Sequence, residues 1–162
     1  MKRLLVIRHG KSDWGNPFQD DFDRPLNHRG LLDAKNMGDH LLSSGYLPNH
    51  IVCSTAKRAI TTAYILAKQL DFKQDFIEQQ KKIYLAPLND LIATVQQIND
   101  DYNNVYIIGH NPGLTSLVSH FTNDWMELKT CCVAILEAHV ASWQHWTKDI
   151  AHLSNHISPK AI

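Results

Sequence analysis

Short, uninterrupted runs of apolar residues constrain the fold of this chain more than any other feature of its sequence. Four such runs span residues 4–7, 51–53, 105–108 and 132–136. Runs without polar alternation are typical of strands that are covered on both faces, as in a largely parallel sheet. Each run is too short for a membrane span or for the core of a signal peptide, so we expect no membrane association and a cytoplasmic location.

Segments with a helical period separate these runs. The spacing of their apolar residues predicts helices over 29–42, 56–70, 87–98 and 112–121. A third, weakly marked strand is expected ahead of residue 84. The resulting order, β-α-β-α-(β)-α-β-α-β, predicts a three-layer α/β/α sandwich with a mostly parallel central sheet.

The helix ends carry recognisable signals. Gly45 is expected to stop the first helix, and Asn111 followed by Pro112 is a cap and proline start for the last one.

The length of 162 residues fits a single domain over 1–162. We expect its core to span about residues 3–138, with a C-terminal strand and tail over 139–162. Trp143 and Trp146 show no clean period, so the sequence leaves open whether they pack on the last strand or shield the sheet edge.

The charge balance excludes a general affinity for polyanions. Sixteen basic residues offset sixteen acidic ones, so any anion site must be local and no nucleic acid partner is expected. Of the three cysteines, Cys131 and Cys132 are adjacent, which argues against a disulfide framework and agrees with a reducing compartment. His152 and His156 have no carboxylate or cysteine in a ligand pattern, and we expect them to be solvated in a loosely structured tail rather than to bind metal.

Unusual polar residues directly follow three of the apolar runs. These segments are Arg8-His9-Gly10, Ser54 to Arg58, and Gly109 to Gly113. In an open α/β sheet, ligands bind in the crevice outside the carboxyl ends of the strands. Two arginines and two histidines that converge there, beside helix N-termini, predict an anion site suited to phosphate. Residues 11–27 form a long polar loop between the first strand and the first helix, and loops of that length are usually functional.

These segments together resemble the histidine phosphatase superfamily, whose fold is that of phosphoglycerate mutase. The resemblance covers most of residues 3–138 and rests on Arg8-His9-Gly10, Arg58-Ala59-x-x-Thr62 and Gly109 to Leu114. The opening Arg8 to Trp14 and the stretch Asp23 to Gly30 look like the small SixA-like phosphohistidine phosphatases within that superfamily.

The resemblance implies a mechanism and a set of site residues. His9 would attack phosphorus in line and form a phosphohistidine intermediate, while Arg8, Arg58 and His110 would hold the phosphoryl oxygens. His110 would contribute most when protonated, a form that a neighbouring phosphate favours. Further contacts to the substrate are expected from Arg24, Ser12, Asn16 and Asn111. No cofactor and no metal are implied.

The sequence lacks the acid that many members of the superfamily use to protonate the leaving oxygen. Asn111 follows His110, and residues 84–87 contain no carboxylate. A general acid contributes about 10²–10⁴ in rate, so its absence penalises phosphate esters. Protonated phosphoimidazole leaves as neutral imidazole without that help. The expected substrate is therefore phosphohistidine on a protein such as a histidine-containing phosphotransfer domain, with the enzyme acting as a monomer.

Several alternatives stay open at this level. Asp13, Asp20, Asp21 and Asp23 are candidates for an acid delivered by the 11–27 loop, which would allow a small-molecule phosphomonoester phosphatase. A non-catalytic phosphoprotein-binding module would use the basic pocket without turnover. A phosphoglycerate mutase is disfavoured because the connection from the third strand to Pro87 is expected to be short.

A cysteine-dependent phosphatase is also disfavoured. Only four residues separate Cys53 from Arg58, and the stretch between them lacks glycine. We expect Cys53 to act as a small buried hydrophobe.

Overall fold

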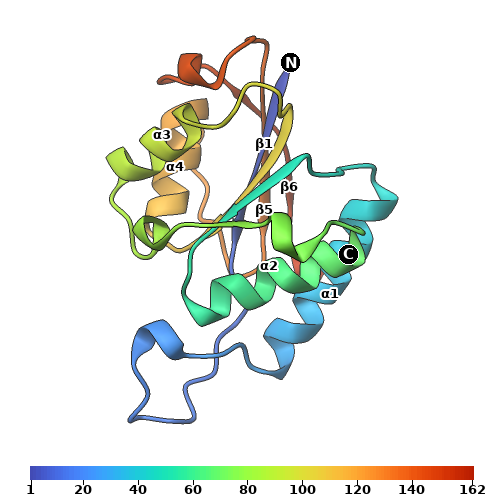
Figure 1. Cartoon of the computed structure of the whole chain (residues 1–162), viewed down its shortest axis with the longest axis vertical. Coiled ribbons are helices and arrows are strands. Elements are labelled where there is room, and N and C mark those ends of the chain that lie inside the picture. Colours follow the sequence, from blue (N-terminus) through green and yellow to red (C-terminus); the bar gives the residue numbers. More distant parts are fainter.

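The centre of the computed structural model, which describes all 162 residues, is a six-stranded sheet with the order β3-β2-β4-β1-β5-β6 (Figure 1). The strands are β1 (Lys2–Arg8), β2 (His50–Cys53), β3 (Glu78–Gln79), β4 (Asn104–Gly109), β5 (Val133–Ala138) and β6 (His152–Ile157). Strands β1 to β4 pair in parallel, and β5 pairs antiparallel with β1 and with β6. The predicted mixed α/β fold with a mostly parallel sheet is confirmed.

Four α-helices cover the two faces of this sheet (Figure 1). They are α1 (His28–Ser43), α2 (Lys57–Gln69), α3 (Leu88–Gln96) and α4 (Gly113–Thr122). The short 3-10 turns are η1 (Asp21–Asp23), η2 (Gln74–Phe76), η3 (Lys81–Ile83), η4 (Trp143–His145) and η5 (Pro159–Ala161). Helices α1 and α2 pack together on one face and α3 and α4 on the other, so the predicted helices and the three-layer arrangement are confirmed.

The central strand β1 explains why its apolar run has no alternation. Leu4 and Val6 point into the core under α3 and α4, whereas Leu5 and Ile7 point into the core under α1 and α2. All four side chains are completely buried. A strand with a helical layer on each side needs apolar residues at every position.

The helix ends follow the signals in the sequence. The side chain of Asn27 caps α1 by accepting a hydrogen bond from the Gly30 N–H at 2.8 Å. Gly45 has a φ of +78°, a conformation that glycine adopts without strain, and it follows the end of α1. At the start of α4 the N-cap is Pro112, one residue later than the expected Asn111, and Asn111 Oδ1 accepts from the Thr115 N–H at 3.2 Å.

The C-terminal segment is more ordered than its sequence indicates. The expectation of a loosely structured tail around His152 and His156 is wrong, because both lie in β6, which pairs with β5. Strand β6 is an edge strand with mostly exposed side chains, so it has little apolar signal. Trp143 and Trp146 are buried in the core under α3 and α4, with ring centroids 5.1 Å apart.

The third strand ends earlier than expected. Strand β3 has two residues and ends at Gln79, so the connection to α3 runs over 80–87 and is not short. Both β3 residues are exposed at the sheet edge, which explains the weak signal. None of the helices has the length and apolar character that crossing a membrane requires.

Candidate active site

The parallel register of three strands brings the polar strand ends together. Arg8 of β1 is paired with Gly109 of β4, and Cys53 of β2 is paired with Ile108. The three strands therefore end at the same level, and the rings of His9 and His110 approach to 5.1 Å between centroids. The convergence at the carboxyl edge of the sheet follows from the strand order.

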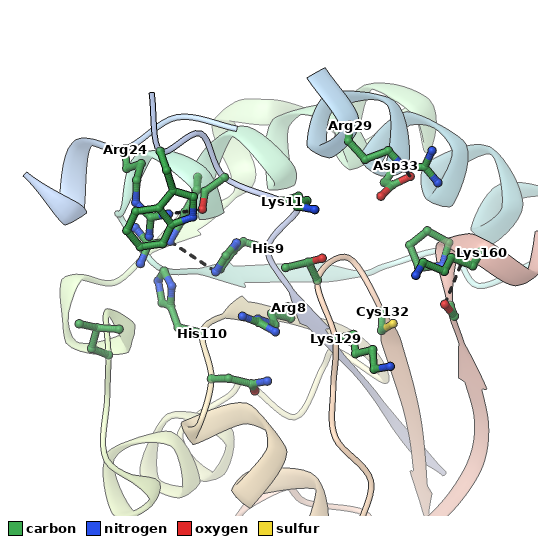
Figure 2. Close-up of a pocket in the computed structure, with 18 residues that line it drawn as sticks. Arg8, His9, Lys11, Arg24, Arg29, Asp33, His110, Lys129, Cys132 and Lys160 are labelled. Atoms are coloured by element: carbon green, nitrogen blue, oxygen red, sulfur yellow. Dashed lines mark hydrogen bonds and ion pairs between the residues drawn. The ribbon is translucent and has the colours of Figure 1, made fainter. Parts of the chain in front are cut away.

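A cavity of about 570 Å³ opens at this edge (Figure 2). Seven of the 18 lining residues are cationic side chains, namely Arg8, Lys11, Arg24, Arg29, Arg58, Lys129 and Lys160. The single lining carboxylate, Asp33, is bound to Arg29 at 3.1 Å. In a chain with no net charge, this is a local site for an anion.

His9 has the protonation state and orientation of a nucleophile. Its Nδ1 lies 2.6 Å from the Gly10 carbonyl oxygen, which can only accept, so Nδ1 carries the proton and Nε2 keeps its lone pair. Burial lowers the pKa of His9 to about 4; the Gly10 carbonyl acts in the opposite direction, and the nearby cations Arg58 and Arg8 add to the lowering. The imidazole is therefore neutral near pH 7.

The two ring nitrogens of His110 have surroundings that differ from those of His9. Its Nε2 is 2.8 Å from Ser54 Oγ, and its Nδ1 is buried with no hydrogen-bond partner. Burial, then His9 and Arg58, lower the pKa of His110 to about 3, so the ring is neutral in the anion-free protein. An anion in contact with the ring would favour the protonated form expected from the sequence.

Arg58 connects the nucleophile to the 11–27 loop. Its Nε lies 3.4 Å from His9 Nε2, on the side of the ring that keeps the lone pair. Its two terminal nitrogens donate to Asp21, one to the backbone oxygen at 2.7 Å and one to Oδ2 at 3.0 Å. Arg58 is buried in this arrangement, with 3% of the residue exposed.

Arg8 and Arg24 complete the cationic cluster. Arg8 donates to the Leu128 carbonyl at 3.4 Å and keeps a buried Nε without a partner. Arg24 donates to Ser12 Oγ and lies with its guanidinium carbon 3.4 Å from the centroid of the Trp14 ring. Its Nε is likewise buried and unpartnered. Unpartnered donors on both arginines fit an anionic ligand with several oxygens.

Asp21 is the one loop aspartate that reaches the cationic cluster. Its oxygens accept hydrogen bonds from Arg24 at 2.8 Å, from Arg58 and from the Tyr84 hydroxyl. Partial desolvation raises the pKa of Asp21, but the hydrogen bonds from Tyr84, Arg24 and Arg58 outweigh it and hold the pKa well below its usual range. The carboxylate is ionised and occupied, so it is a poor proton donor.

Close backbone packing positions His9. A Cβ at Gly10 would lie 2.9 Å from the Gly30 carbonyl oxygen, so the turn after β1 approaches α1 only with glycine there. The Gly10 N–H donates to Thr62 Oγ1 at 3.0 Å, and the same hydroxyl donates to the Arg58 carbonyl at 2.7 Å. One side chain thus holds the turn after β1 against the first turn of α2.

The structure separates the residues expected to touch the substrate. Ser12 lines the cavity and accepts from Arg24, whereas Asn16 is exposed outside the lining and accepts from the Phe18 N–H at 3.1 Å. Asn111 lines the cavity, but its amide also joins α4 to the next loop by donating to the Leu128 carbonyl at 2.6 Å. Cys53 is buried in the core under α1 and α2, where burial raises the pKa of its thiol.

Sequence reasoning missed three residues of the site. Tyr84 packs its ring edge-to-face on His110 with 5.4 Å between centroids, and Lys129 and Lys160 line the far part of the cavity. Tyr84 lies in the stretch 84–87, whose sequence does not show that the ring contacts His110. No local pattern marks the two lysines, because long connections separate them from the strand-end motifs.

The geometry suits attack by a neutral imidazole on a phosphorus atom whose oxygens face the arginines. The two carboxylates that contact arginines of the site, Asp21 and Asp33, are not free to protonate a leaving group. No group of three or more His, Cys, Asp or Glu side chains is arranged to hold a metal ion.

Comparison with known proteins places these features in context. Residues 4–85 match the model of the histidine phosphatase superfamily (branch 1). An uncharacterised chloroplast protein of Arabidopsis thaliana is 31% identical over 151 residues, which cover 88% of this chain and 69% of the plant protein. A 2,3-bisphosphoglycerate-dependent phosphoglycerate mutase of Baumannia cicadellinicola is 36% identical over 73 residues, but these span 44% of this chain and only 31% of the mutase.

Among solved structures, that of the protein histidine phosphatase SixA complexed with tungstate superimposes with a TM-score of 0.85. The match covers 98% of both chains at 18% sequence identity. At this identity the likeness shows a common fold and leaves the substrate to be argued from the site.

Proposed function

The chain belongs to the histidine phosphatase superfamily, and from that membership we propose that it removes the phosphoryl group from phosphohistidine on protein substrates. The superfamily contains both phosphatases and mutases, so the choice of reaction and substrate rests on the residues of this site.

In the proposed reaction His9 Nε2 attacks phosphorus while the bond from phosphorus to the substrate imidazole breaks. The Nδ1 proton of His9 stays on the ring, and the Gly10 carbonyl stabilises the cationic phosphoimidazole that results. Arg8, Arg58 and His110 hold the phosphoryl oxygens, whose transfer depends chiefly on position and electrostatics. Water then hydrolyses the phosphoenzyme and releases inorganic phosphate.

The observation that carries the substrate choice is the state of Asp21. Its carboxylate accepts from Arg24, Arg58 and Tyr84. The single carboxylate of the cavity lining, Asp33, is bound to Arg29. An ester needs a proton on its leaving oxygen, and the site offers no carboxylic acid to give one. The protonated phosphoimidazole of a substrate leaves as a neutral ring, so the missing acid costs nothing with that substrate.

The proposal includes a cellular setting. A histidine-containing phosphotransfer domain is the proposed protein substrate, and the enzyme would act as a cytoplasmic monomer without a cofactor. The exposed rim of the cavity supports a macromolecular substrate, since the Trp14 side chain is 76% exposed and Leu85 is 56% exposed.

The experiment compares phosphate release from a phosphohistidine protein and from phenyl phosphate, with the wild type and His9→Ala in parallel. We expect the phosphohistidine protein to be preferred by at least about 10²-fold in kcat/KM, in line with the rate that a general acid contributes. Release should be abolished in His9→Ala and retained in His156→Ala, an exposed histidine on β6. Loss of activity in both variants would contradict the assignment of the nucleophile.

A small-molecule phosphomonoesterase is the second candidate, because the mutase match covers 44% of this chain. Comparable turnover of phenyl phosphate and the phosphohistidine protein would favour it. Tight retention of the phosphoprotein without release by the wild type would instead indicate a binding module.

A further inference from the structure

We propose that Lys11, Lys129 and Lys160 form a second anion-binding subsite, which takes acidic side chains of the protein that presents the phosphohistidine. We call these three residues the lysine subsite. The proposal rests on the proposed function, since it names the surface of the protein substrate that docks beside the reaction centre.

The lysine subsite is assembled from three distant segments. Lys11 follows the His9 turn, Lys129 lies between α4 and β5, and Lys160 lies in η5 at the C-terminus. In Figure 2, Lys129 and Lys160 occupy the end of the cavity opposite Arg24 and His110, with Arg8 and His9 between the two ends. One continuous cavity thus has a reaction end and a distal basic end.

The position of Lys160 is determined by the local structure. The side chain of Ser158 accepts a hydrogen bond from the Lys160 N–H and caps η5, and Pro159 occupies its first turn. Turn η5 packs against α1, which bears Arg29 and Asp33 of the cavity wall. Strand β6 and this turn therefore place a cation on the wall of the cavity.

The three lysines have no carboxylate partner within the protein. All are exposed, and none takes part in an ion pair. The single carboxylate of the cavity lining, Asp33, is engaged by Arg29 at 3.1 Å. Three uncompensated charges in a chain of zero net charge attract an anion that is separate from the phosphoryl group.

The size of the cavity also calls for more than a phosphoryl group. A water molecule takes up about 30 Å³ of liquid, and the cavity measures about 570 Å³. A phosphoryl group has only four heavy atoms and is held by the arginines and histidines at one end. The remaining space accommodates further parts of the substrate.

The types of cation at the two ends differ in what they recognise. The planar guanidinium groups of the partly buried Arg8 and the buried Arg58 suit the several oxygens of a phosphoryl group, whereas an ammonium on a flexible stem is a mobile point charge. Exposed, mobile lysines suit carboxylates on a protein surface, where they steer association and add modest affinity. The exposed Trp14 and Leu85 at the reaction end add apolar contact area for a protein.

The test uses the double variant Lys129→Gln/Lys160→Gln and the matched control Lys148→Gln. Lys148 is also exposed and without an ion pair, and it lies in the loop before β6, outside the cavity lining. Steady-state kinetics are measured with a phosphorylated histidine phosphotransfer domain and with phosphoramidate. We expect the ratio of the two KM values, protein over phosphoramidate, to rise about tenfold in the double variant only, and the rise to shrink at high salt.

A binding measurement separates failure of the subsite from failure of the proposed function. Calorimetry at low salt measures the binding of hexaglutamate and, separately, of pyrophosphate to the unreacted protein. Hexaglutamate binding that is kept in Lys148→Gln and lost in the double variant supports the subsite, even if the wild type hydrolyses no phosphoprotein. Equal binding of hexaglutamate by all three proteins would overturn it. A loss confined to pyrophosphate would also overturn it, because the lysines would then serve a second phosphate of a small substrate.

Discussion

The two ends of the cavity are built on different principles. The reaction end is formed by the parallel strands β1, β2 and β4, whose last residues lead directly into His9, Ser54 and His110. Two residues of the lysine subsite, Lys129 and Lys160, lie in segments that flank β5 and β6, the antiparallel side of the sheet. The strand register therefore positions the residues of the proposed reaction. Loops and the C-terminal turn position the residues of the proposed recognition.

The ends also differ in burial and in partners. Arg58 and Arg24 are 3% and 8% exposed and are held by Asp21, while the three lysines are exposed and unpaired. Buried, preorganised charges have strong effects because the site does not need to rearrange around them. Exposed charges are screened by solvent and salt, so substitutions at the distal end should have small effects that depend on ionic strength.

The largest effect should come from replacing an arginine of the reaction end by lysine. The reverse exchange in the lysine subsite should have a small effect. Arg58→Lys removes the hydrogen bonds to Asp21 and the Nε next to His9, so we expect kcat to fall by about 10²–10³-fold. Lys129→Arg conserves the positive charge in an exposed position and should change kcat/KM for the phosphoprotein by less than about threefold. Single-turnover phosphate release measures both. Similar losses in the two variants would remove the distinction between the ends.

The free energy of unfolding should depend on pH through the two buried histidines, His9 and His110. Burial lowers the pKa of His9 to about 4 and that of His110 to about 3, from an ordinary value of 6.5. Below pH 6.5 the unfolded chain binds a proton at each histidine while the folded protein does not. The free energy of unfolding should therefore fall as the pH falls from 6.5 toward 4, by up to about 1.4 kcal/mol per pH unit for each histidine.

Urea unfolding at a series of pH values measures this slope. We expect the slope between pH 6 and 5 to be smaller in His110→Gln than in the wild type, by about the contribution of one histidine. An unchanged slope would mean that His110 is already protonated in the folded protein and that its burial does not lower its pKa.

The fold was predictable where the local signals were strong. Apolar runs without alternation marked β1 and β4, which are buried on both faces, and capping by Asn27 and the left-handed Gly45 agree with the bounds of α1. The strand expected within 139–162 could not be placed there, because the exposed residues of β6 carry almost no apolar pattern. Its pairing with β5 is a long-range contact that no window of sequence contains.

The residues of the candidate site also differ in whether the sequence alone identifies them. The residues that directly follow strands, His9 and His110, were identifiable because their place in the sheet follows from the strand alone. The partners of Arg58 were not identifiable, since Asp21 reaches it only through the path of the 11–27 loop. Tyr84 was likewise invisible, because its role depends on packing against His110.

A smaller effect than that of Arg58→Lys should come from Asp21, which joins the loop to the buried end. Asp21→Asn keeps the size and one acceptor oxygen but removes the charge that holds Arg24 and Arg58. We expect kcat/KM to fall by about tenfold, a cost of about 1.4 kcal/mol, and by the same factor for a phosphohistidine protein and for phenyl phosphate. Equal losses follow from looser positioning of the arginines, which both substrates require.

A proton donor would give a different result. If Asp21 protonated the leaving oxygen, Asp21→Asn would cost phenyl phosphate about 10²–10⁴ and spare the phosphohistidine protein. Asp23→Asn is the matched control, because Asp23 lies on the same turn η1 and its exposed side chain makes no hydrogen bond or ion pair. The ratio of the two losses therefore decides whether Asp21 acts on the arginines or on the leaving group, whatever the absolute rates are.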